Sequence, residues 1–189
     1  MNLPIGLTLT RIVAVPLLIL FLISSSRVHA IIAAGIFIAA ALTDWLDGVV
    51  ARRRNQVTTL GTLLDPIADK LLVAAALVSL LTIDKVPAVA VVVIIGRELA
   101  VTGLRAVSAG HGVIVPASRL AKWKTAGQYV AITMLILEKG IISNAFHALA
   151  MGVLWVAVAL TVVSAVDYFY RFLRKADYRA IVPDEERWS

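Results

Sequence analysis

Long hydrophobic stretches dominate this chain, and polar residues gather between them. Six apolar runs are bounded by charged or turn-forming residues, and they lie near 5–24, 30–50, 67–83, 87–105, 123–138 and 146–170. A helix needs about 20 apolar residues to cross roughly 30 Å of hydrocarbon, so most runs are long enough and the third is short. The runs lack the alternation of a β-barrel. The pattern predicts an all-α integral membrane protein, a bundle of six transmembrane helices.

Composition agrees with that pattern. Apolar residues make up 60% of the 189 residues and charged residues 16%, which lies outside the usual range of soluble globular domains. No stretch remains for a soluble domain. We therefore expect one six-helix transmembrane domain over residues 1–175 and a short tail over residues 176–189.

Basic residues are concentrated in alternate connections between the predicted spans. The even-numbered loops and the two termini hold most of them, whereas the opposite face holds only Arg27, Lys85 and Lys139. The positive-inside rule then places both termini at the cytoplasmic side of the cell inner membrane. The net charge of +6 could suggest nucleic acid, but these cations flank membrane spans and no aromatic platform for bases lies among them. Membrane lipids are the expected partners, and nucleic acid is not.

Four aspartates lie close together in the chain, between two apolar runs. Asp44 and Asp47 are three residues apart, and Asp65 and Asp69 are four apart, so each pair shares one face of a helix. Asp65 precedes Pro66, a sequence typical of a helix cap followed by the first helical residue. We therefore expect the third helix to begin there, with two pairs of carboxylates facing each other across a short loop at the cytoplasmic side.

Carboxylates near hydrocarbon need compensation, because each unpaired charge costs roughly 2.5 to 3.5 kcal/mol. Arginine pairing is one solution, and hard divalent cations are the other, since they prefer carboxylate oxygens and leave positions open for phosphate. Four carboxylates balance two such ions. Small residues between the pairs, Gly48, Ala51 and Gly61, either leave room for a nucleotide or serve as helix-packing positions.

The spacing D-x2-D-G-x2-A-R-x8-G-x3-D-x3-D resembles the signature of the CDP-alcohol phosphotransferase family of membrane enzymes. Its fixed positions are Asp44, Asp47, Gly48, Ala51, Arg52, Gly61, Asp65 and Asp69. Further stretches resemble the bacterial branch that uses glycerol 3-phosphate as acceptor. They are "LTLTR" (7–11), "ARRRNQVTTLGTLLDPIADKLLVAAAL" (51–77), "GRELAVTGLR" (96–105) and "KWKTAGQ" (122–128).

This resemblance implies a six-helix fold, usually a homodimer, in which a phosphatidyl group passes from CDP-diacylglycerol to sn-glycerol 3-phosphate with release of CMP. It implies two divalent cations, Mg²⁺ or Mn²⁺, and assigns Asp69 as general base. The metal ligands would be Asp44, Asp47, Asp65 and Asp69, and the nucleotide pocket would be formed by Gly48, Ala51, Arg52 and Gly61.

A phosphorylated acceptor needs cations outside the metal site. Four basic residues lie at the same predicted cytoplasmic level and are candidates for binding its phosphate, namely Arg105, Arg119, Lys122 and Lys124. Each could instead be a topology anchor. Arg97 and Glu98 are adjacent, point about 100° apart on a helix and are not expected to pair with each other. Arg97 should meet either a site carboxylate or the acceptor phosphate, or form a buried structural ion pair.

Two other functions are compatible with these residues. The same site could serve another acceptor, as in a cardiolipin synthase or a phosphatidylinositol-phosphate synthase of this family. From a different class, the aspartates could line the pathway of a small cation transporter. The acids gather at one face with no matching acids toward the other, which favours the enzyme.

Overall fold

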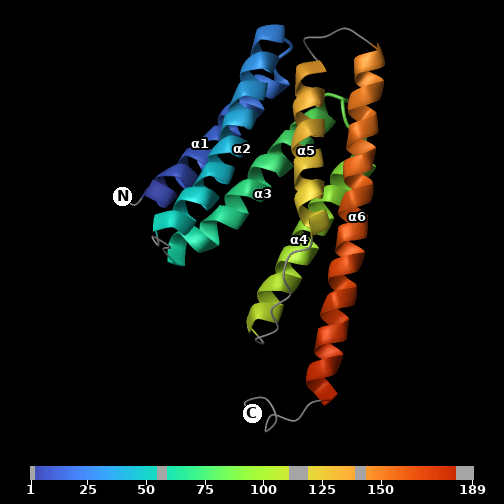
Figure 1. Cartoon of the computed structure of the whole chain (residues 1–189). Coiled ribbons are helices and arrows are strands. Elements are labelled where there is room, and N and C mark those ends of the chain that lie inside the picture. Colours follow the sequence, from blue (N-terminus) through green and yellow to red (C-terminus); the bar gives the residue numbers. More distant parts are fainter. Residues whose placement is uncertain (1–2, 55–58, 111–118, 139–143, 182–189) are drawn as a thin grey trace.

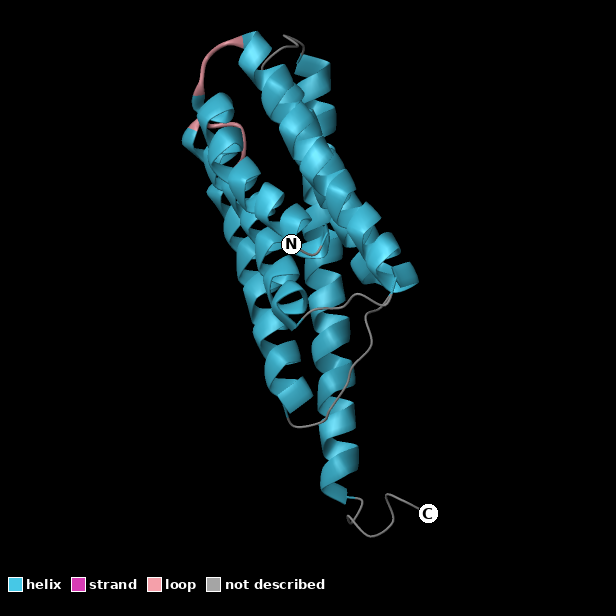
Figure 2. Ribbon diagram, turned by 90° about the vertical axis from the view of Figure 1, so that its left-hand side faces the viewer, coloured by secondary structure: helices cyan, strands magenta, loops and turns pink. Residues whose placement is uncertain are grey.

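The computed structural model describes residues 3–54, 59–110, 119–138 and 144–181, and the side chains of residues 10–43, 67–108, 123–138 and 144–174. These residues form helices and no strand (Figure 2). The helices are α1 (Leu3–Ile23), α2 (Arg27–Arg54), α3 (Thr59–Thr82), α4 (Ala88–Gly110), α5 (Arg119–Leu137) and α6 (Asn144–Ile181). The predicted all-α class is confirmed, and each helix covers most of one predicted apolar run.

The predicted start of the third helix is wrong. α3 begins at Thr59, so Asp65 is not its N-cap and Pro66 is not its first residue; both lie inside the helix. Proline inside a helix removes one backbone hydrogen bond. In an apolar environment, ending the helix there would leave several backbone groups without partners, which costs more than one lost bond. The longer helix is therefore the favoured solution.

Successive helices run in opposite directions; α1 lies against α2 and α3, while α5 lies against α6 and α2 (Figure 1). α4 packs mainly against α6. One continuous apolar core joins all six helices, because each contributes side chains that are fully buried. Its largest members are Leu18, Leu22, Phe37, Leu72, Leu77, Leu80, Ile94, Ile132, Leu135, Ile136 and Leu154.

A tight turn ends α3 and directs the chain into α4. Asp84 takes a left-handed backbone conformation with φ of 56°. Its N–H donates to the carbonyl of Leu81 at 3.0 Å, and the N–H of Lys85 donates to the carbonyl of Leu80 at 2.9 Å. This pair of bonds is the Schellman arrangement, which satisfies the last carbonyls of a helix. The turn fixes Lys85 at the end of the bundle.

Alternate connections share one end of the bundle. The α1–α2 and α3–α4 turns and the start of α6 lie at the upper end in Figure 1, whereas α2, α4 and α6 all end toward the lower side. The C-terminal ends of α2, α4 and α6 therefore share one end of the bundle. Of the three basic residues predicted for the opposite end, Arg27 and Lys85 lie at the upper turns, and Lys139 lies outside the described residues.

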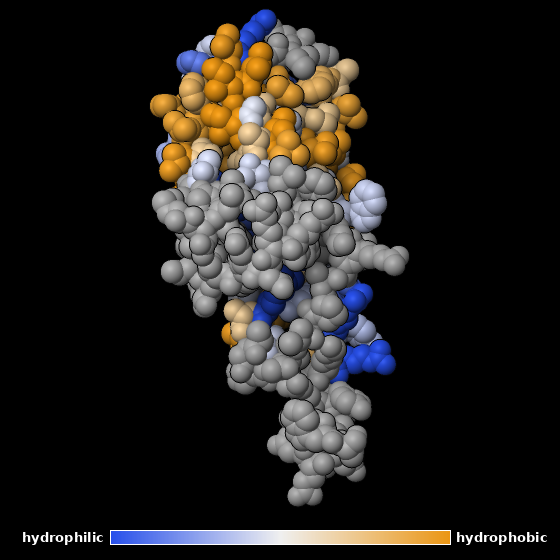
Figure 3. Space-filling view, turned by 60° about the vertical axis from the view of Figure 1, so that its left-hand side comes forward, coloured by the Kyte–Doolittle hydropathy of each residue, from blue (hydrophilic) through white to orange (hydrophobic). Residues whose placement is uncertain are grey.

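Apolar side chains also cover much of the outer surface of the bundle. Val13, Leu20, Ile31, Val92 and Val166 are each more than half exposed, and Figure 3 shows such residues gathered over the upper part of one face. Soluble monomers rarely expose so much contiguous apolar surface. Among the described residues, the segment Asn144–Arg174 is long and apolar enough to cross a membrane, and Thr10–Ile23 and Arg27–Thr43 form shorter apolar helices.

Candidate functional site

The four aspartates lie on two consecutive antiparallel helices, at matching distances from the ends where residues 55–58 join them. Asp44 and Asp69 are each ten residues from those ends (54 − 44 and 69 − 59). Asp47 and Asp65 are seven and six residues away (54 − 47 and 65 − 59). At about 1.5 Å per residue, the backbone positions form two levels, near 15 Å and near 10 Å from the joined ends.

Of these four aspartates, Asp69 is the one whose side chain the structure describes. It is half-buried, and its Oδ1 accepts a hydrogen bond from the phenol of Tyr129 on α5. The ring of Tyr129 packs against Phe37 on α2, with ring centroids 5.4 Å apart. Phe37 thus supports the Tyr129 ring, and the hydrogen bond from Tyr129 directs the Asp69 carboxylate toward α5.

Next to Asp69 lies a polar cluster that joins α4, α5 and α6. The ammonium of Lys124 is buried and bonds to Oε1 of Glu98. The same oxygen accepts from Nη1 of Arg97 at 3.2 Å, and Nη2 of Arg97 donates to the hydroxyl of Ser164 at 2.8 Å. Lys124 is close enough to interact electrostatically with Asp69. The carboxylate of Glu98 therefore bonds two cations, Lys124 and Arg97, whose side chains are 4% and 11% exposed.

The expectation that Arg97 and Glu98 do not pair was wrong. They are separated by about 100° on the helix, but both side chains are long enough to bend toward the same buried space. Desolvation favours this, because a buried cation without an acid is very costly. In the structure Arg97 forms an ion pair with Glu98, which is the last of the three roles considered for it.

The four candidate acceptor cations do not form one described cluster. Arg105 is exposed on α4, and its guanidinium carbon lies 5.7 Å from the ring centroid of Tyr168. It is seven residues beyond Glu98, or about 10 Å along the helix from the level of Lys124. Arg119 and Lys122 lie in the first turn of α5, and their side chains are outside the described set. The structure thus separates Arg105 from Lys124.

The residues predicted to bind the nucleotide and the metal lie mostly outside the described side chains. Gly48, Ala51 and Arg52 are on α2 and Gly61 is on α3, within the same segments as Asp44, Asp47 and Asp65. Among the side chains that are described, no three His, Asp or Glu form a metal-binding group. Carboxylate donors on two matching helical levels have the chemistry that Mg²⁺ or Mn²⁺ requires.

Three polar residues of this region were not predicted from the sequence. They are Tyr129, which bonds Asp69, Ser164, which bonds Arg97, and Thr161, which accepts from the amide of Gln128 at 3.0 Å. A useful signal was present, because a phenol or hydroxyl within an apolar run needs a buried partner. The sequence could not tell which partner, since the helices that supply it are far apart in the chain.

Comparisons with known proteins agree on one family. The sequence profile described as CDP-alcohol phosphatidyltransferase matches residues 1–163. The chain is 45% identical over 183 residues to the CDP-diacylglycerol–glycerol-3-phosphate 3-phosphatidyltransferase of Bacillus subtilis, which covers 89% of this chain and 93% of that protein. A Rickettsia bellii protein of the same name is 42% identical over 171 residues, with coverage of 89% and 93%. A cardiolipin synthase (CMP-forming) of Oryza sativa is 38% identical over 194 residues, covering 92% of this chain and 58% of that protein.

Proposed function

Because the chain belongs to the CDP-alcohol phosphatidyltransferase family, we propose that it transfers the phosphatidyl group of CDP-diacylglycerol to sn-glycerol 3-phosphate, giving phosphatidylglycerophosphate and CMP. The observation that carries this function is the similarity over nearly the full length to two glycerol-3-phosphate phosphatidyltransferases. The family is membrane-embedded and generally uses divalent metal ions.

Asp69 acts as the general base in this proposal. The acceptor hydroxyl oxygen attacks the phosphorus that bears the diacylglycerol, the bond from that phosphorus to CMP breaks, and the hydroxyl proton passes to Asp69. A carboxylate has about four lone-pair positions, so the hydrogen bond from Tyr129 leaves room for the acceptor. A positioned base of this kind typically contributes 10² to 10⁴ in rate.

Asp44, Asp47, Asp65 and Asp69 would hold two divalent cations, Mg²⁺ or Mn²⁺. When bound, such ions neutralise the charge of a diphosphate and of its leaving group. The matching helical levels of the aspartates support this assignment. Gly48, Ala51, Arg52 and Gly61 would form the CDP pocket, since small residues allow close approach to a helix backbone. We expect chelation to abolish CMP release and either ion to restore it.

Four basic residues remain proposed to bind the acceptor phosphate, and their expected contributions differ. They are Arg105, Arg119, Lys122 and Lys124. Lys124 already neutralises Glu98. It would therefore contribute positive electrostatic potential near Asp69 more than a direct bond to the acceptor phosphate. Arg105 is exposed and lies over the ring of Tyr168, a position from which its guanidinium can still donate to an anion.

We further propose six membrane spans in the inner membrane, a homodimer, and an active site and both termini that face the cytoplasm. The exposed apolar surface and the shared end of alternate connections support the spans and their direction. Cysteine labelling of single-cysteine variants in intact cells would test the direction, and the chain has no native cysteine to remove.

Purified protein in detergent or nanodiscs tests the activity. CMP should appear only when CDP-diacylglycerol, a divalent cation and glycerol 3-phosphate are all present. A panel of acceptors that includes phosphatidylglycerol and inositol phosphate separates the branch from its relatives. If turnover is faster with either of these acceptors than with glycerol 3-phosphate, the family assignment stands but glycerol 3-phosphate is not the preferred acceptor.

A further inference from the structure

A basic residue of α1 is buried within the bundle. Arg11 is 1% exposed, it is the largest of the fully buried side chains, and all three nitrogens of its guanidinium are shielded from solvent. It is engaged by a neighbouring group. A guanidinium keeps its charge in proteins, and a buried charge is very costly unless it is paired. The neighbour of Arg11 is therefore expected to be an anion.

The buried face of α1 is directed at the two helices that carry the aspartates. Arg11, Val15, Leu18 and Leu22 are all buried, and their spacing of four, three and four residues places them on one face of the helix. α1 packs against α2 and α3 (Figure 1). Arg11 thus lies on the face of α1 that meets the helices of the proposed metal site.

A ring contact between α1 and α2 gives the depth of Arg11 in the bundle. Phe21 on α1 and His29 on α2 meet edge to face, with ring centroids 5.3 Å apart. Because these helices run in opposite directions, Arg11, ten residues before Phe21, is level with Ala39, ten residues after His29. Asp44 is five residues further along α2, or about 7 to 8 Å toward the lower end. Helical side chains lean toward the N-terminus of their helix, and the N-terminus of α1 is its lower end. Arg11 therefore extends toward the level of Asp44.

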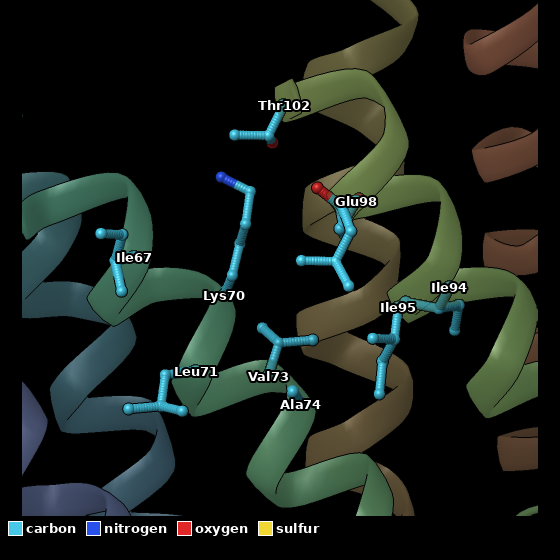
Figure 4. A pocket seen from close by; sticks show the side chains of 10 residues that line it. Ile67, Lys70, Leu71, Val73, Ala74, Ile94, Ile95, Glu98 and Thr102 are labelled. Atoms are coloured by element: carbon cyan, nitrogen blue, oxygen red, sulfur yellow. The ribbon is translucent and has the colours of Figure 1, made fainter. Parts of the chain in front are cut away.

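The other described cations of this region gather around α4. Lys124 and Arg97 bond Glu98 on that helix. Lys70 lines a cavity between α3 and α4, and Figure 4 shows its ammonium directed into the space between these two helices. Arg11 instead faces α2 and α3 from α1. It is therefore the cation that α1 supplies to the aspartates.

We propose that Arg11 pairs with the carboxylate of Asp44 and is a positioning residue of the metal site. This rests on the proposed function, in which Asp44 holds a divalent cation. A carboxylate has about four lone-pair positions, so it can accept from a guanidinium and still bind an ion. Hydrogen-bonded partners orient carboxylates that ligate metals, and loss of such a partner typically costs about 10- to 100-fold in metal affinity or activity. Before an ion binds, Arg11 also offsets the charge of the acid.

Unfolding without metal tests the pair itself. In detergent with EDTA, Arg11→Met should lower the unfolding temperature by at least about 6 °C, because it leaves the acid without its counter-charge. Adding Asp44→Asn should recover at least half of that loss, whereas adding Asp47→Asn should not. Arg11→Gln replaces Arg11→Met in this cycle if the methionine variant does not fold. An unchanged unfolding temperature, or recovery that is no greater with Asp44→Asn than with Asp47→Asn, overturns the proposal.

Manganese binding tests the positioning role. The Kd for Mn²⁺, measured by electron paramagnetic resonance, should rise about 10- to 100-fold in Arg11→Met. Arg11→Lys, which keeps the charge, should restore part of the affinity, and Arg11→Met should have no further effect in an Asp44→Asn background. Arg171→Met is the matched control, since Arg171 pairs with Asp167 on α6 at 2.9 Å. An unchanged Mn²⁺ affinity in Arg11→Met overturns the positioning role.

The two measurements separate this proposal from the proposed function. If the wild-type protein binds no Mn²⁺, the metal assignment fails, and the unfolding cycle in EDTA still decides whether Arg11 and Asp44 are paired. If the wild-type protein binds Mn²⁺ and releases CMP while the unfolding cycle shows no specific recovery with Asp44→Asn, the proposed function stands and the pair is refuted.

Discussion

Two glutamates of this bundle, Glu98 and Glu138, are neutralised in different ways. The side chain of Glu98 is 19% exposed, and its partners Lys124 and Arg97 have side chains that are only 4% and 11% exposed. Glu138 directly follows α5 at the upper end, and its partners Lys85 and His147 are 32% and 47% exposed. Lys85 bonds Glu138 at 2.7 Å and His147 lies 3.0 Å from it.

The two acids differ in how exposed their cationic partners are. Around Glu138 the partners are accessible to water, so these ion pairs join the start of α4, the end of α5 and the start of α6 at a modest electrostatic cost. Around Glu98 all partners are buried, so the charges depend on one another. The Glu98 cluster also adjoins Asp69, whereas the Glu138 cluster has no described link to it. The first should couple stability to activity, and the second should affect stability alone.

The largest expected effect belongs to the acid beside the Glu98 cluster. Asp69→Asn keeps the shape of the side chain and its place beside Tyr129 but removes the base. We expect kcat to fall by about 10² to 10⁴, with substantial binding of CDP-diacylglycerol retained. Steady-state kinetics and lipid binding by equilibrium dialysis would measure both.

Asp167→Asn is the matched control, because Asp167 pairs with Arg171 on α6 at 2.9 Å, away from the site. A nearly fully active Asp69→Asn variant would refute the base assignment. Asp65→Ala should instead lose metal affinity and activity together, as measured by Mn²⁺ titration.

The second prediction concerns the Glu98 cluster, which the substitution disrupts. Glu98→Ala leaves Lys124 and Arg97 buried without an acid, and we expect about 3 to 5 kcal/mol less stability. Thermal unfolding in detergent would measure the loss. The double variant Glu98→Leu with Lys124→Met should recover part of it, because a buried pair replaced by apolar residues is often neutral. No recovery in the double variant would contradict the pairing argument.

A smaller effect is expected at Tyr129, the α5 residue that bonds Asp69. Tyr129→Phe keeps the packing against Phe37 and removes one hydrogen bond to a carboxylate, a loss of about 1.5 kcal/mol. We expect kcat to fall about tenfold with little change in either KM. Tyr170→Phe, at a residue 66% exposed on α6, serves as control. Equal changes in kcat for the two variants would show that the Asp69 bond has no role in turnover.

The smallest effect should come from the Glu138 cluster. Glu138→Gln retains hydrogen bonding but removes the charge, and partly exposed pairs contribute about 1 kcal/mol or less. Unfolding should shift slightly and CMP release should stay at the wild-type rate. A loss as large as that of Glu98→Ala would remove the distinction between the two clusters.

The apolar runs were sufficient to predict the all-helical class and six helices, because a backbone in hydrocarbon has few ways to satisfy its polar groups. The aspartate spacing was sufficient to identify the family. The start of α3 could not be read from Asp65 and Pro66, because local cap signals are weak compared with the cost of ending a helix in an apolar environment. The pairing of Arg97 with Glu98 was missed because helical angle alone ignores the length and burial of the two side chains.

What the sequence itself determined is therefore periodic or local: which segments are helices, which residue types gather near residues 44–69, and which connections carry positive charge. Tertiary packing decided the partners. Tyr129 reaches Asp69 across 60 residues and Arg97 reaches Ser164 across 67. The physical reason is that a buried polar group must find a partner wherever the bundle supplies one, and chain order does not record that neighbour.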